Sequence, residues 1–131
     1  MIRTKITDTD PSTGAPIEVP VELRKGVHRA STLLEAGLPA DTFEIDAHWQ
    51  FATQPDGKLG VILDLTTPYG GRTVGYTGYP FDADAFADDA RIRRGLDTPV
   101  WNFNRTLAYL NKLDIKHIRE KAEQLQPLRG E

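Results

Sequence analysis

The sequence predicts an α+β fold, in which an antiparallel sheet of order β-β-α-β-β-β is followed by about three helices packed on one of its faces. Apolar and polar residues alternate through residues 43–51 and again through 59–65. Such a period of two is typical of strands with one buried face. Gln54-Pro55-Asp56-Gly57 separates the two runs and favours a turn, and beyond residue 81 the apolar spacing becomes helical.

The first part of the chain predicts two strands and a helix. Residues 2–6 and 17–21 have strand character, and the loop between them is dense in turn-forming residues. Pro20 cannot donate a ladder hydrogen bond, so we expect the second strand at an edge or a bulge. A short helix follows and ends at Gly37. Its apolar stripe consists of Leu23, Val27, Ala30 and Leu34.

The central hairpin has a predictable register. Pairing about its turn places Trp49 opposite Leu63 on the buried side and His48 opposite Asp64 on the polar side. A third strand is expected over residues 72–79, after the Gly70-Gly71 turn.

Three helices are expected after this sheet. Asp82 can cap the first, and Gly95 can stop it. Thr98-Pro99 can start the second, and Asp114 can cap the third. The second helix would bury Val100, Phe103, Leu107 and Leu110, and the third would present Ile115, Ile118, Ala122 and Leu125 on one face. Residues 1–131 suit one domain, with 127–131 as a frayed tail.

Composition excludes several classes of site. Cysteine is absent, which removes disulfides, thiolate zinc sites and thiol nucleophiles. The three histidines fall on different predicted elements, so we expect no metal and no cofactor. No apolar run approaches the roughly 20 residues that span a bilayer. We therefore expect a soluble cytoplasmic protein without membrane contact.

Charge is unevenly distributed along the chain. Residues 38–90 carry two basic and nine acidic groups, whereas 91–131 carry nine basic and five acidic groups. If these regions stay apart, the molecule has an acidic face and a basic end. The basic end suggests a nucleic-acid-contacting accessory protein as one alternative, although no stacking aromatic residue stands among its cations. These cations are Arg91, Arg93, Arg94, Lys112, Lys116, Arg119 and Lys121.

His48 and Asp64 form a candidate acid-base pair, because a carboxylate can orient and charge an imidazole. A small hydrolase- or lyase-type enzyme is the corresponding alternative function. No serine is placed near this pair to complete a nucleophilic triad. The favoured explanation of the two residues is a cross-strand pair that stabilises an exposed sheet face, ahead of ligand binding or catalysis.

The segment from Tyr69 to Phe81 is the richest candidate for a binding surface, because it mixes aromatic rings with glycines that allow close backbone approach. It lacks the lysine of a phosphate loop. The expected contacts are Tyr69, Arg72, Tyr76 and Tyr79. The favoured function is a small non-enzymatic binding or adaptor domain that engages a protein or peptide partner through this rim of the sheet.

The order of a helix, a meander ending in Tyr79-Pro80-Phe81, and later helices with Trp101 resembles ubiquitin-conjugating-type folds. That family uses an active cysteine, which this chain lacks, and an additional strand normally follows the Tyr-Pro-Phe tripeptide. The resemblance implies an inactive, partner-binding relative.

Overall fold

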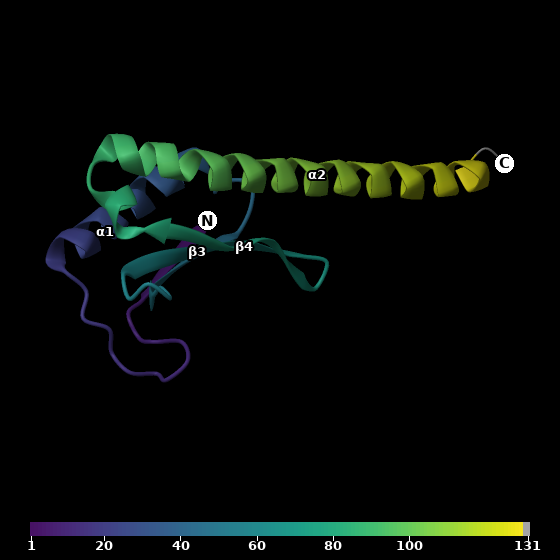
Figure 1. The fold of residues 1–131 in the computed structure, drawn as a ribbon. Helices are drawn as coiled ribbons and strands as arrows, with labels where there is room; N and C mark the ends of the chain where they lie inside the picture. Colours follow the sequence, from purple (N-terminus) through teal and green to yellow (C-terminus); the bar gives the residue numbers. More distant parts are fainter. Residues whose placement is uncertain (130–131) are drawn as a thin grey trace.

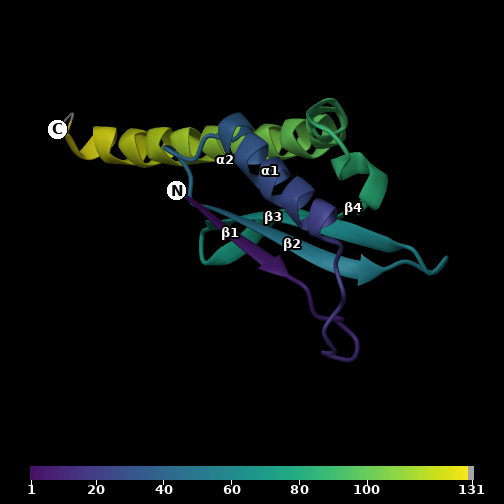
Figure 2. The same ribbon diagram turned by 90° about the vertical axis from the view of Figure 1, so that its left-hand side faces the viewer.

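The computed structural model describes the backbone of residues 1–129 and the side chains of residues 1–112. A four-stranded sheet lies under two helices that both cover the same face (Figures 1 and 2). The elements are β1 (Ile2–Thr7), α1 (Val21–Gly37), β2 (Ile45–Thr53), β3 (Leu59–Tyr69), β4 (Arg72–Asp82), the short 3₁₀ helix η1 (Ala83–Phe86) and α2 (Asp89–Arg129).

The strands follow one another in the order β1-β2-β3-β4, so β1 and β4 form the two edges of the sheet. The β2–β3 and β3–β4 pairs are antiparallel, whereas β1 runs parallel to β2. Parallel neighbours need a long crossover connection, and α1 provides it by crossing the face of the sheet. The predicted antiparallel sheet is therefore wrong, because the sheet is mixed.

The predicted register of the central hairpin is confirmed. Trp49 pairs with Leu63 and His48 pairs with Asp64. The odd-numbered residues of β2 and β3 face the helices, and Trp49 and Leu63 are fully buried there. The even-numbered residues lie on the opposite face, which the helices do not cover.

The strand predicted over residues 17–21 is absent, and this corrects the β-β-α order to β-α-β. Pro16 makes only an isolated bridge with Thr9, which closes the preceding loop. Pro20 lies directly before α1, where its fixed φ and its missing N–H cost nothing. The alternating pattern of residues 17–21 is too short to overcome these two prolines.

The prediction of about three C-terminal helices is also wrong, because one continuous helix, α2, runs through Gly95, Pro99 and Asp114. The burial of the apolar side chains along this helix outweighs the helix-ending tendency of Gly95 and Pro99. Pro99 is fully buried, and it continues the stripe of Ile92, Leu96, Phe103 and Leu107 that faces the core. Residues 130–131 of the expected frayed tail, and the side chains of the expected stripe after Asp114, lie outside the described residues.

An aromatic cluster joins the sheet to both helices. The Trp49 ring lies 6.1 Å from Phe81 and 5.9 Å from Phe86, and Phe81 and Phe86 are 5.5 Å apart. These tilted and edge-on arrangements are the favourable ones for aromatic pairs. The three rings come from β2, β4 and η1, so their packing fixes where the chain leaves the sheet and enters α2.

Two helical glycines make room for this cluster. A Cβ atom on Gly26 of α1 would lie 2.6 Å from the Phe86 carbonyl oxygen, and one on Gly95 of α2 would lie 3.1 Å from the Phe81 ring. Glycine weakens a helix by about 1 kcal/mol relative to alanine. The close approach of the aromatic residues explains why these two positions are glycine.

We predict that Gly26→Ala destabilises the protein by about 1 to 3 kcal/mol, because the new methyl group would overpack the Phe86 backbone. Gly37→Ala is the matched control, since its Cβ would meet Val100 at 3.4 Å, an ordinary contact. Urea unfolding of both variants measures the effect. Equal stability of Gly26→Ala and the wild type would contradict the proposed packing.

Candidate functional site

The structure brings the four predicted binding residues to one face of the β3–β4 hairpin. Tyr69 pairs with Arg72 at the hairpin end, Tyr76 pairs with Leu65, and Tyr79 pairs with Leu63. Leu63 and Leu65 face the core, so all four binding residues lie on the helix-covered side of the sheet. We call residues 69–81 the rim, because they form the β4 edge of the sheet and the turn that leads into it.

Aromatic rings form a row along the rim. Tyr76 and Tyr79 are 5.6 Å apart, and Tyr79 lies 4.8 Å from the buried Phe81. Both tyrosines are half-buried and pack against the core, whereas Arg72 is exposed. The row therefore runs outward from the aromatic cluster to the surface, and its outer members present both ring area and a hydroxyl group.

A shallow groove of about 420 Å³ lies beside the inner end of this row. Tyr79, Pro80 and Phe81 of β4 line one wall, and Arg91 and Arg94 of α2 line the other. Gly95 also contributes, so the groove lies at a close approach of α2 to β4. Apolar rings and two guanidinium groups thus converge at the same place.

Asp64 has a structural role at the bulge of β4. Thr77 and Gly78 together oppose Asp64, because the register shifts by one residue between Leu63 and Leu65. Gly78 takes a φ of 72°, which suits glycine, and its backbone N–H donates to the Asp64 carboxylate. The carboxylate therefore stabilises the bulge.

The candidate acid-base pair is aligned in register but not joined by a hydrogen bond among the described residues. His48 Nε2 lies 2.8 Å from the Thr7 hydroxyl of β1, while Asp64 accepts from Gly78 of β4. Both side chains are half-buried on the uncovered face of the sheet. His48 thus contacts β1 and Asp64 contacts β4. These structural contacts account for the presence of both side chains without a catalytic role.

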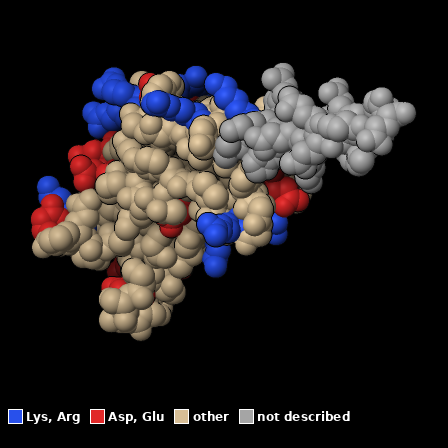
Figure 3. All heavy atoms as spheres, turned by 90° about the vertical axis from the view of Figure 1, so that its right-hand side faces the viewer, with Lys and Arg blue, Asp and Glu red and all other residues tan. Residues whose placement is uncertain are grey.

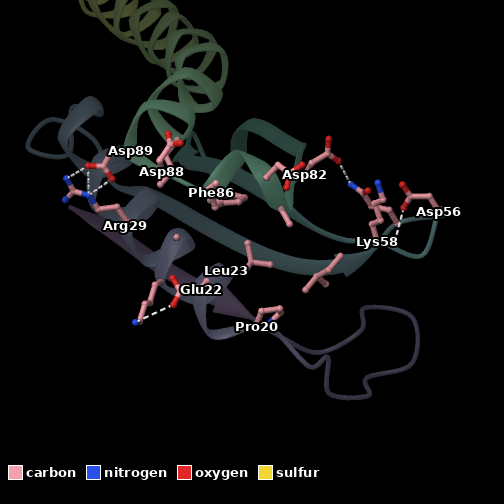
Figure 4. A pocket seen from close by; sticks show the side chains of 18 residues that line it. Pro20, Glu22, Leu23, Arg29, Asp56, Lys58, Asp82, Phe86, Asp88 and Asp89 are labelled. Carbon is pink, nitrogen blue, oxygen red and sulfur yellow. Dashed lines mark hydrogen bonds and ion pairs between the residues drawn. The ribbon is translucent and has the colours of Figure 1, made fainter.

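A larger groove of about 820 Å³ lies between α1, η1 and the start of α2. Figure 4 shows Arg29, Asp88 and Asp89 at one end and Asp56 and Asp82 at the other. Leu23 and Phe86 lie between the two ends. Many acids of the middle region thus gather along one groove, in agreement with the acidic face expected from the sequence.

Interactions within the fold account for most of these carboxylates. Asp82 accepts a hydrogen bond from Gln54, and Asp88 accepts one from the Arg91 backbone. Arg29 donates to both oxygens of Asp89, with its shortest bond at 2.8 Å. This hydrogen bonding, more than the opposite charge itself, lowers the pKa of Asp89 and raises that of Arg29. Asp89 therefore attaches α1 to the start of α2, whereas Asp82 binds the turn after β2 and Asp88 binds its own local segment.

Sequence reasoning missed one surface, the outer side of α2. Trp101 and Tyr109 are each 62 % exposed, and Arg105 stacks over the Trp101 ring at 5.4 Å. Figure 3 shows Lys and Arg gathered along the top of the molecule, where α2 lies in Figure 1. The spacing of four residues between Trp101, Arg105 and Tyr109 is the signal that would have found this surface. Aromatic residues do stand among these cations, contrary to the expectation.

No group of three potential metal-ligating side chains occurs in the described part of the chain, and no helix there is long and apolar enough to cross a membrane. Comparison with known proteins gives no match to a family, to a curated protein or to a solved structure. Functional assignment therefore rests on the residues of this chain.

We predict a pH-dependent contribution from the Arg29–Asp89 pair. Because folding lowers the Asp89 pKa below its ordinary value of 3.8, the pair stabilises the fold above that pH and loses its effect as the pH falls through the folded value. Asp89→Asn should therefore be less stable than the wild type near pH 7, and the difference should shrink toward about pH 2. Urea unfolding at both pH values measures this difference.

Asp97→Asn removes another exposed carboxylate of α2 and serves as the matched control. A stability difference for Asp89→Asn that does not change with pH would show that the pair does not act through ionisation.

Proposed function

We propose that this protein is a small non-enzymatic binding domain that engages a protein partner through the rim. The observation that carries the proposal is the row of half-buried tyrosines on an edge strand, beside a groove that contains two arginines. Tyrosine and arginine are the residue types that most often dominate the binding energy of protein interfaces.

The geometry of β4 favours recognition through side chains at its inner end. Proteins commonly protect edge strands with bulges and prolines, and β4 has both, at Thr77-Gly78 and at Pro80. Regular backbone pairing by a partner strand is therefore disfavoured from Thr77 to Pro80. The Tyr79 groove, which lies beside this stretch, offers a concave apolar surface instead.

The outer part of β4 is suited to a different contact. Residues 72–75 pair regularly with β3, and their other side forms the edge of the sheet. An extended segment of a partner could add to the sheet there while its side chains reach Tyr76 and Arg72. Main-chain pairing near the hairpin end and side-chain contacts near the groove together define a surface about 26 Å long.

Capture from a host lysate with the tagged full chain tests the proposal, with the lysate divided into nuclease-treated and untreated halves. We expect one dominant protein partner in both halves. Arg72→Glu and Tyr76→Ala should each reduce its capture about tenfold or more, because both side chains belong to the contact surface.

Lys5→Glu is the matched control, since it reverses an exposed charge on the uncovered face at the opposite edge of the sheet. Thermal unfolding of each variant shows whether the fold is retained. Undiminished capture by well-folded rim variants would refute the proposed surface.

A further inference from the structure

We propose that the outer side of α2 binds single-stranded nucleic acid. The surface consists of two exposed aromatic rings with cations beside and between them. We call it the basic-aromatic stripe, and its members are Arg94, Trp101, Arg105, Tyr109 and Lys112. It belongs to one helix and lies apart from the tyrosine row, although Arg94 also lines the rim groove.

Helix geometry places these side chains on one side. Their spacings of seven, four, four and three residues correspond to whole turns of an α-helix. The buried residues Phe103 and Leu107 point the other way, into the core. Trp101 and Tyr109 are about 12 Å apart along the axis, and Arg105 lies between them.

The exposed rings offer flat faces to a partner. Trp101 is 62 % exposed, and the Arg105 guanidinium lies 5.4 Å from the centre of its ring. Nucleic-acid bases stack on aromatic rings whatever their sequence, and arginine adds cation–π attraction. An acidic peptide would neutralise the cations but would leave the rings without stacking partners.

Charge on this part of the helix also suits a polyanion. Arg94, Arg105 and Lys112 are exposed, and none of them forms an ion pair with a described side chain. Asp97 is the single acidic residue from Ala90 to Lys112. Six acidic residues line the separate groove around η1 and the first turn of α2, namely Glu22, Asp56, Asp82, Asp84, Asp88 and Asp89. Phosphate groups would meet positive potential along the stripe.

The test is fluorescence anisotropy of a labelled 20-nucleotide oligothymidine mixed with the full chain at about 50 mM salt. We expect binding whose affinity falls steeply as salt is added. Trp101→Ala and Tyr109→Ala should each weaken binding about tenfold through lost stacking. Arg105→Gln should weaken binding and lower the salt dependence by about one ion.

Two controls make the experiment specific. Lys5→Gln removes one exposed charge from the uncovered sheet face and should change the affinity less than about threefold. Oligothymidine should also quench tryptophan fluorescence, and Trp101→Phe should abolish the quenching, since the only other tryptophan, Trp49, is fully buried.

Absence of binding, or equal weakening by Lys5→Gln and Arg105→Gln, would overturn the proposal. Tighter binding of a labelled polyglutamate peptide would assign the stripe to an acidic protein and would also overturn it. So would an oligomer that Trp101→Ala converts to monomer without any oligothymidine binding, because the stripe would then be a contact between copies of this chain.

Discussion

The contact of Trp49, Phe81 and Phe86 is the interaction on which the rest of the structure depends. These rings come from three separate elements, and two helical glycines, Gly26 and Gly95, let α1 and α2 approach them. The cluster determines where β4 ends and α2 begins. It therefore positions both the tyrosine row, which continues outward from Phe81, and the groove beside the inner end of that row.

Much of the sheet could be predicted from local pattern, whereas its connections could not. The period of two fixed the pairing of Trp49 with Leu63, because a slip of one residue would expose every apolar side chain. The parallel β1–β2 pair depends on contacts distant in sequence and leaves no local trace. Gly95 and Pro99 are ordinary helix boundary signals, and only the packing of Gly95 against Phe81 and the burial of Pro99 explain why α2 continues through both.

The candidate surfaces also differ in how much of each could be predicted from the sequence. The segment 69–81 stands out by composition, and register then brings its four selected residues to one face. His48 and Asp64 are opposite each other as expected, yet Thr7 and Gly78 provide their hydrogen-bond partners, which no pattern in the sequence indicates. Trp101 lies on the side of α2 opposite the buried Phe103 and Leu107. The predicted burial of that stripe, together with the spacing of four between Trp101, Arg105 and Tyr109, could therefore have indicated that Trp101 is exposed.

The proposed role of the rim as the protein-binding surface can be tested directly by backbone amide hydrogen exchange of the full chain, with and without its captured partner. We predict slower exchange within residues 72–82 on binding, with little change in residues 3–7 of β1, at the opposite edge of the sheet. Protection confined to β1 or to α2, with β4 unchanged, would contradict the account.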